Sequence, residues 1–161
     1  MVKLLKSFYY AGRGVVTALV SERNMRIHTV CMIYMYFFLF AFDFFEITRT
    51  QLAVIFIANG LVIGGELINT AIESVVDMVS PEYSKNAEIA KDCAAGAVLV
   101  FAFFSVLCGI AIMWQPKAFS ALFGFCAENY WFIAVFLLSL ILSIWFIFRG
   151  SKNENRKSKN K

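Results

Sequence analysis

The sequence predicts an all-α integral membrane protein. Of its 161 residues, 60% are hydrophobic, and the mean hydropathy of +0.70 is typical of membrane proteins rather than soluble ones. The apolar residues lie in long runs without charges, and about 20 such residues suffice to cross the hydrocarbon core as a helix. A basic amphipathic segment precedes these runs and a basic tail follows them.

The N-terminal segment, residues 1–20, is predicted to be an amphipathic surface helix. Large apolar side chains alternate there with Lys3, Lys6 and Arg13. This pattern suits a helix that lies in the headgroup plane with its apolar side in the membrane. A secretory signal peptide is not expected, because the segment has neither a continuous apolar core nor a small-residue cleavage site.

Four later stretches are predicted to be transmembrane helices. In chain order they are Thr29–Phe42 with an extension to about Ile47, Leu52–Val79, Cys93–Trp114 and Tyr130–Phe148. Pro81 ends the second of them, because the residue before a proline disfavours the helical conformation. The fourth carries no charge and only Ser139 and Ser143 as polar residues, so packing or anchoring is its expected role.

The basic residues are distributed unevenly about these spans. Arg49 and Lys117 lie in the connections on one side. The other side holds Lys3, Lys6, Arg13, Arg23, Arg26, Lys85, Lys91, Arg149, Lys152, Arg156, Lys157, Lys159 and Lys161. The positive-inside rule makes that side cytoplasmic, together with both termini. The net charge of +4 therefore indicates contact with anionic headgroups or phosphate, and not with nucleic acid.

A polar stripe follows the cytoplasmic half of the second predicted span. Glu66, Asn69, Glu73 and Asp77 fall within roughly 80° of one another around a helix. An ionised acid near the bilayer centre costs on the order of 3 kcal/mol. Three acids on one face are hard to explain by packing, so the stripe indicates a functional site.

Other charged residues are expected on the same side of the membrane. Glu22 is the only acid before the first span, and Lys91 and Asp92 begin the third. His28 ends the polar cluster around Glu22 and is interpreted as an interface histidine without an assigned role.

These groups could hold Mg²⁺ and, through it, a polyphosphate, since Mg²⁺ favours one or two carboxylates together with phosphate oxygens. Glu66 lies about 10 Å deeper than Glu73 along the helix. A buried carboxylate there is suited to accept a proton from a lipid alcohol. The spacing leaves a second class open, a non-enzymatic transporter or proton relay, because acids inside membranes commonly mark ion pathways.

The run Glu66-Leu-Ile-Asn69-Thr-Ala-Ile-Glu73-Ser-Val-Val-Asp77, with Lys91-Asp92 fourteen residues later, resembles the signature of the small prokaryotic diacylglycerol kinase family. That family includes the undecaprenol kinases of Gram-positive bacteria. The resemblance covers about residues 3–115, and the Glu22–His28 run looks more like the undecaprenol kinase branch.

The resemblance implies an ATP-dependent kinase domain over residues 1–115 in a multi-pass protein of the bacterial inner membrane. It implies a homotrimer of three-span subunits with composite active sites at the subunit interfaces. The γ-phosphate of ATP would pass, with Mg²⁺, to a lipid alcohol, with undecaprenol as the first expectation and diacylglycerol as the alternative. Residues 116–149 would add a transmembrane helix beyond the family pattern, and residues 150–161 a basic disordered cytoplasmic tail.

The resemblance also implies roles for individual residues. Glu66 matches the catalytic base that meets the lipid, Glu22 and Glu73 match the metal-binding acids, and Asn69 matches a supporting position. The positions that match nucleotide contacts are Tyr10, Glu22, Glu73, Asp77, Glu82, Ser84, Lys91 and Asp92.

Overall fold

All regular structure in residues 2–149, the part of the chain that the computed structural model describes, is helical. The helices are α1 (Val2–Ser21), α2 (Arg23–Ala41), α3 (Arg49–Val79), α4 (Lys85–Met113), α5 (Pro116–Glu128) and α6 (Tyr130–Arg149). The prediction of an all-α chain is confirmed for these residues. The tail predicted at 150–161 lies outside the described residues.

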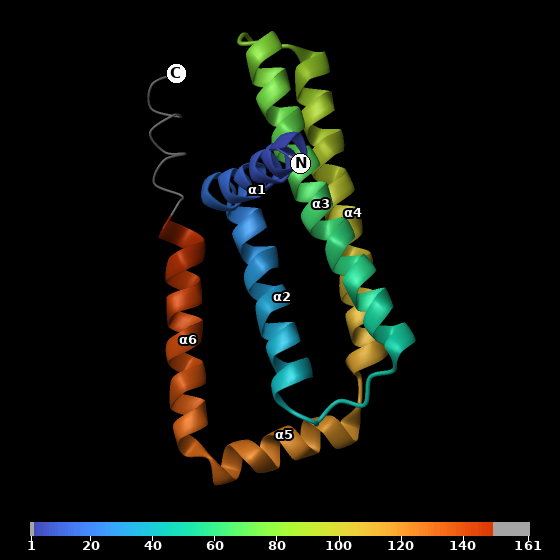
Figure 1. Ribbon diagram of the computed structural model, residues 1–161, viewed down its shortest axis with the longest axis vertical. Helices are drawn as coiled ribbons and strands as arrows, with labels where there is room; N and C mark the ends of the chain where they lie inside the picture. The colour runs from blue at the N-terminus through green and yellow to red at the C-terminus, as the bar shows by residue number, and fades with distance from the viewer. Residues whose placement is uncertain (1, 150–161) are drawn as a thin grey trace.

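The helices α3 and α4 form a long antiparallel hairpin, and they lie side by side along most of their length (Figure 1). A capping box starts α3, in which the Thr48 hydroxyl accepts from the Gln51 backbone N–H and the Gln51 side chain accepts from the Thr48 N–H. The helix ends at Val79, as Pro81 predicts.

Three of the described helices are long and apolar enough to cross a membrane, namely α3, α4 and α6. The helix α2, predicted as the first span, is not among them. It begins with Arg23, carries Arg26 and His28 in its first turns, and ends at Ala41 instead of extending to Ile47. Its apolar part, residues 29–41, is about 20 Å long at 1.5 Å per residue, which is shorter than the hydrocarbon core.

The segment 116–149, predicted as one additional helix, is divided into two. Pro116 stands at the first position of α5, where its missing N–H costs nothing. In Figure 1, α5 runs across the lower end of the molecule and joins α4 to α6. Only α6 has the length and composition of a span.

The helix α6 packs against α2. The Tyr34 hydroxyl lies 2.9 Å from the Ser139 Oγ and 3.0 Å from the Ser143 Oγ, and the rings of Tyr34 and Phe136 meet edge to face. Both serines of α6 therefore contribute to its packing against α2, and packing was one of the two roles expected for this span.

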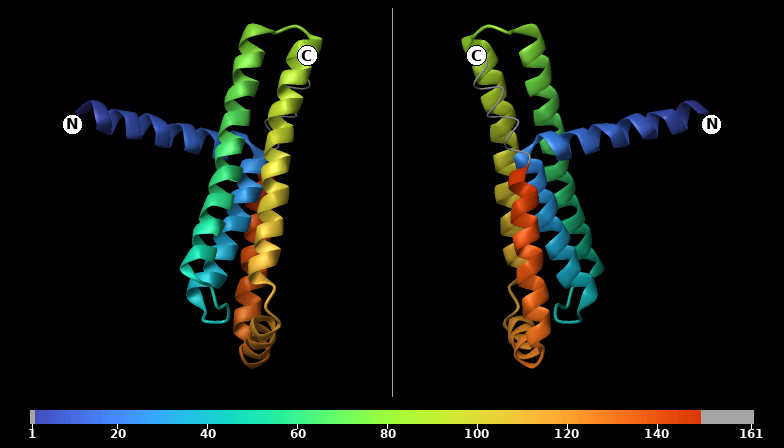
Figure 2. Two further views of the ribbon diagram at one scale, coloured as in Figure 1. Left: turned by 90° about the vertical axis from the view of Figure 1, so that its right-hand side faces the viewer. Right: turned by 90° about the vertical axis from the view of Figure 1, so that its left-hand side faces the viewer.

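The helix α1 leaves the bundle at a steep angle and projects to one side (Figure 2). Leu5, Phe8 and Val16 on it are exposed. Exposed apolar side chains agree with a helix that lies on a membrane surface, which stays a prediction for α1.

The helices α3 and α4 lie close together at Gly65. A Cβ built there would lie 2.9 Å from the Phe101 Cδ2, whereas Gly60 and Gly64 have nothing within 4 Å. Of these three glycines, Gly65 is therefore the one at which α3 lies against a side chain of α4.

Gly65→Ala is expected to be less stable than Gly64→Ala by about 1–3 kcal/mol, because a methyl group at residue 65 must displace the Phe101 ring. Both substitutions gain the same helix propensity, so Gly64→Ala is the matched control. Thermal unfolding in detergent, followed by circular dichroism, measures the difference. Equal midpoints would contradict the contact at Gly65.

Candidate active site

A cavity of about 330 Å³ lies between α2, α3 and α4. Its polar lining consists of Glu22, Asn24, His28, Glu66, Asn69 and Glu73. The α4 wall is made of small and apolar side chains, among them Ala95 and Leu99. The two helical turns between Glu66 and Glu73 place both carboxylates on the same face of α3. The structure thus brings three predicted acids and Asn69 together within a single chain.

Glu66 is the most deeply buried acid of the cavity, with 2% of its surface exposed. Its Oε1 lies 3.4 Å from the His28 Nε2, too poorly aligned for a hydrogen bond, and it has no hydrogen-bond partner among the described residues. A buried carboxylate oxygen without a partner is costly. Its presence indicates a role other than stabilising the fold.

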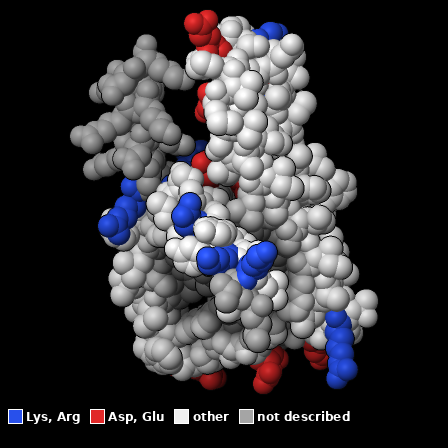
Figure 3. Space-filling model, turned by 45° about the horizontal axis from the view of Figure 1, so that its top comes forward, with Lys and Arg blue, Asp and Glu red and all other residues white. Residues whose placement is uncertain are grey.

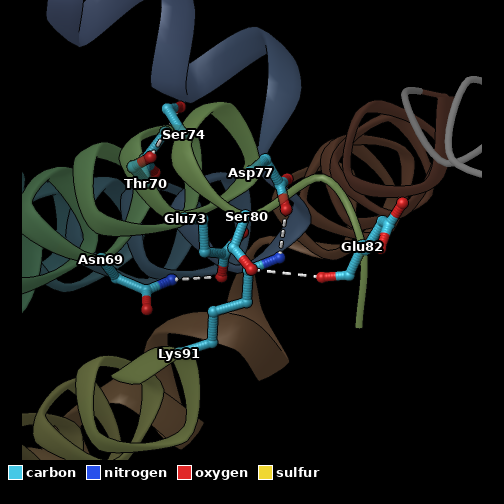
Figure 4. A network of polar contacts seen from close by, with 8 residues as sticks. All are labelled: Asn69, Thr70, Glu73, Ser74, Asp77, Ser80, Glu82 and Lys91. Atoms are coloured by element: carbon cyan, nitrogen blue, oxygen red, sulfur yellow. Dashed lines mark hydrogen bonds and ion pairs between the residues drawn. The ribbon is translucent and has the colours of Figure 1, made fainter. Parts of the chain in front are cut away.

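Asn69 links the deep and shallow parts of the stripe. Its Nδ2 donates to the Glu73 Oε1 at 2.9 Å (Figure 4), while its own Oδ1 is buried and, within residues 2–149, unpartnered. The carboxylate and amide oxygens of the cavity are the donors that Mg²⁺ prefers. The described residues contain no cluster of three or more His, Cys, Asp or Glu side chains that could hold a metal alone. Such a cluster is not required where two carboxylates bind Mg²⁺ and phosphate oxygens supply further ligands.

Asp77 and Lys91 form an ion pair between α3 and α4 (Figure 4). The pair lies outside the cavity lining, and 65% of the Asp77 side chain is exposed. An exposed pair contributes little to stability. Lys91 therefore remains available to exchange its partner for a phosphate.

The other predicted nucleotide contacts do not line the cavity. Tyr10 is 59% exposed on α1, with the Arg13 guanidinium 6.0 Å from its ring centroid. The Glu82 carboxylate points away from the Asp77–Lys91 pair in Figure 4. Ser84 precedes α4 without a side-chain cap, and Asp92 is exposed.

Asn24 and His28 are cavity residues to which the sequence analysis gave no role. Their spacing of four residues indicates that they lie on the same face of α2, since residues at i and i+4 share a helix face. The sequence alone does not show that this face meets Glu66.

A second cavity, of about 370 Å³, adjoins the first and shares Ile27, His28 and Ala102 with it. Its remaining lining is mostly apolar and includes Met35, Val62 and Val106. The polar cavity around Glu66 thus continues into an apolar one between α2, α3 and α4.

The fold and these two cavities define a helical membrane protein in which a polar cavity with a buried acid lies beside a mostly apolar one. Residues 9–113 match the family model of prokaryotic diacylglycerol kinase. The chain belongs to this family, so the expected resemblance and the expectation of a lipid kinase are confirmed at the family level. The match ends where α4 ends, before α5 and α6.

Curated relatives carry two kinase names. A diacylglycerol kinase of Synechocystis is 42% identical over 70% of this chain, a match that spans only 63% of that relative. An undecaprenol kinase of Bacillus subtilis is 38% identical over 71% of this chain and 90% of its own length. A diacylglycerol kinase of Escherichia coli is 29% identical over 70% of this chain and 90% of its own length.

Glu66→Gln is expected to leave the thermal midpoint nearly unchanged, because the Glu66 Oε1 accepts no hydrogen bond from the described residues and a glutamine of the same shape keeps the contact with His28. Glu73→Gln is the comparison variant, with an expected loss of about 1 kcal/mol or less, because its carboxylate accepts a charge-assisted bond from Asn69. Thermal unfolding in detergent tests both. A clear loss of stability in Glu66→Gln would mean that the carboxylate holds the fold together.

Proposed function

We propose that this chain transfers the γ-phosphate of ATP to the hydroxyl of a membrane lipid. The observation that carries the proposal is the buried Glu66 carboxylate in the polar cavity, whose Oε1 accepts no hydrogen bond within residues 2–149 and lies 3.4 Å from His28, a residue that also lines the apolar cavity. A lipid alcohol needs both surroundings, since its chain is apolar and its reacting hydroxyl is not.

Glu66 is the proposed catalytic base. It takes the proton from the lipid hydroxyl while that oxygen forms a bond to the γ-phosphorus and the bond from the γ-phosphorus to the ADP oxygen breaks. Burial keeps water, the competing acceptor, away from the reacting hydroxyl. His28, 3.4 Å from the Glu66 Oε1, borders both cavities and restricts the approach of the hydroxyl.

Glu22 and Glu73 are the proposed ligands of Mg²⁺, with Asn69 orienting Glu73. When bound, Mg²⁺ neutralises charge on the phosphates of the donor. The nucleotide is proposed to contact Asp77, Lys91 and Asp92, which lie near the turn of the α3–α4 hairpin. It is also proposed to contact Tyr10, Glu82 and Ser84. The exposed ion pair of Lys91 supports this, because a phosphate can replace Asp77 as its partner.

Undecaprenol is the proposed preferred alcohol and diacylglycerol the second. The Bacillus subtilis undecaprenol kinase supports this order, because at equal coverage of 90% of its length it is 38% identical, against 29% for the Escherichia coli diacylglycerol kinase. The Synechocystis and Escherichia coli relatives support diacylglycerol. The transporter alternative finds no support among these kinase names.

The proposed location is the bacterial inner membrane, with both termini in the cytoplasm and three subunits in a trimer. In Figure 1 the α3–α4 turn and the C-terminal end of α6 lie toward one end, and α5 lies at the other. Asp43, Glu46 and Glu128 flank the lower connections, and Figure 3 shows acidic side chains at that end. Among the basic residues that the structure describes, Arg49 and Lys117 begin α3 and α5 at that end, and the scarcity of basic residues there supports the proposed orientation.

In mixed micelles with Mg-ATP, the purified protein is expected to phosphorylate undecaprenol, and diacylglycerol more slowly. Glu66→Gln should lower the turnover by about 10²-fold or more, because it removes the base. Glu73→Gln should raise the Mg²⁺ concentration needed for half-maximal activity. Radiolabelled product on thin-layer plates is the measurement, and equimolar competition between the lipids gives the preference.

Lys117→Ala, remote from the cavity, is the control and should match the unsubstituted chain. Equal activity in Glu66→Gln and the control would refute the assigned base. Glu66-dependent proton flux in liposomes without ATP consumption would replace the kinase by a proton relay.

A further inference from the structure

Arg26 is a buried cation, 2% exposed, that contacts the ends of two other helices. Its Nη1 donates to the Val20 carbonyl at 2.7 Å and to the Leu19 carbonyl at 3.4 Å. Its Nε donates to the Ile147 carbonyl at 3.0 Å. The first two acceptors belong to α1 and the third to α6, 121 residues later in the chain.

These carbonyls are suited to a buried guanidinium. The last four carbonyls of a helix lack intrahelical partners, and a helix C-terminus carries roughly half a negative charge. All three acceptors lie in the final turns of their helices, since α1 ends at Ser21 and α6 at Arg149. Two helix C-termini therefore converge on one cation, and the removal of either leaves the cation less compensated.

The same contacts fix the corner between α1 and α2. Glu22 is the corner residue, with extended backbone at φ −99° and ψ 125°. Its N–H donates to the Ala18 carbonyl at 2.8 Å, and its carbonyl accepts from the Arg26 N–H at 3.3 Å. Arg26 thus binds the chain just before Glu22 through its side chain, and the Glu22 carbonyl through its own backbone N–H. The Glu22 side chain lines the polar cavity.

We propose that α6, through its Ile147 carbonyl and Arg26, holds the α1–α2 corner so that Glu22 stays in place to bind the metal–nucleotide complex. Arg26 is then a positioning residue. The C-terminal segment beyond the family match supports the active site without touching it. The inference rests on the proposed function of Glu22 as a metal ligand.

The proposed support of the corner by α6 is tested with two shortened chains, one test variant and one control. A chain ended after Ser143 loses the Ile147 carbonyl but keeps both serines that contact Tyr34. A chain ended after Arg149 keeps every described contact and is the matched control. Arg26→Lys in the full chain is the second variant, because an ammonium keeps the charge but not the fork of donors.

The first readout is hydrogen exchange at the amides of Glu22 and Arg26, which is independent of activity. Exchange should become about tenfold faster in the Ser143-ended chain and in Arg26→Lys, since the corner opens more often. The Arg149-ended chain should match the full one. Unchanged exchange in both test variants would overturn the inference.

The second readout separates binding from turnover. The Mg²⁺ concentration for half-maximal activity should rise about tenfold in the test variants, with kcat nearly unchanged. A loss of this size is typical when a residue that orients a metal ligand is removed. Faster exchange with an unchanged Mg²⁺ requirement would also overturn the inference. A Glu22→Gln variant with an unchanged Mg²⁺ requirement would instead refute the proposed role of Glu22, whatever the exchange data show about α6.

Discussion

The burial of the Glu66 carboxylate is the constraint on which the rest of the site depends. A carboxylate can be kept there only if the surrounding helices supply enough stability to offset its desolvation. The close packing of α3 on α4 at Gly65, the adjacent residue, provides part of that stability. The unpartnered Oε1 shows that the fold leaves this oxygen without the hydrogen bond that a structural acid would have.

The length of α3 joins two environments. Its 31 residues extend about 46 Å, more than the hydrocarbon core requires. A single helix can therefore carry Glu66 buried in the polar cavity and Asp77 among exposed polar groups. The helix itself sets the order of depth, from Glu66, the proposed base, to Glu73, the proposed metal-binding acid, to the Asp77–Lys91 pair.

Helical periodicity explains how much of the site was predictable. Glu66, Asn69 and Glu73 share one face of one helix, so local spacing suffices to place them together. The contact of His28 with Glu66 joins residues 38 positions apart on different helices, and no local pattern contains it. For Tyr10, Glu82 and Ser84 the only indication was the family resemblance, and these residues lie outside the cavity of the single chain. The helix α5 was not predicted, because its 13 residues lie in the connection between two predicted spans and are too few to cross a membrane.

The polar groups of α2 explain why a chain of this family can make use of an added helix. The apolar part of α2 is short, and Arg26 and Tyr34 carry polar atoms that lipid cannot satisfy. On α6 they find the Ile147 carbonyl, Ser139 and Ser143, which lie about one helical turn apart along a single face. Polar contacts between helices are favoured inside membranes because lipid offers no alternative partner. We infer that α6 completes the environment of α2, and that a helix too short and too polar to qualify as a span by itself is accommodated as the inner member of a pair.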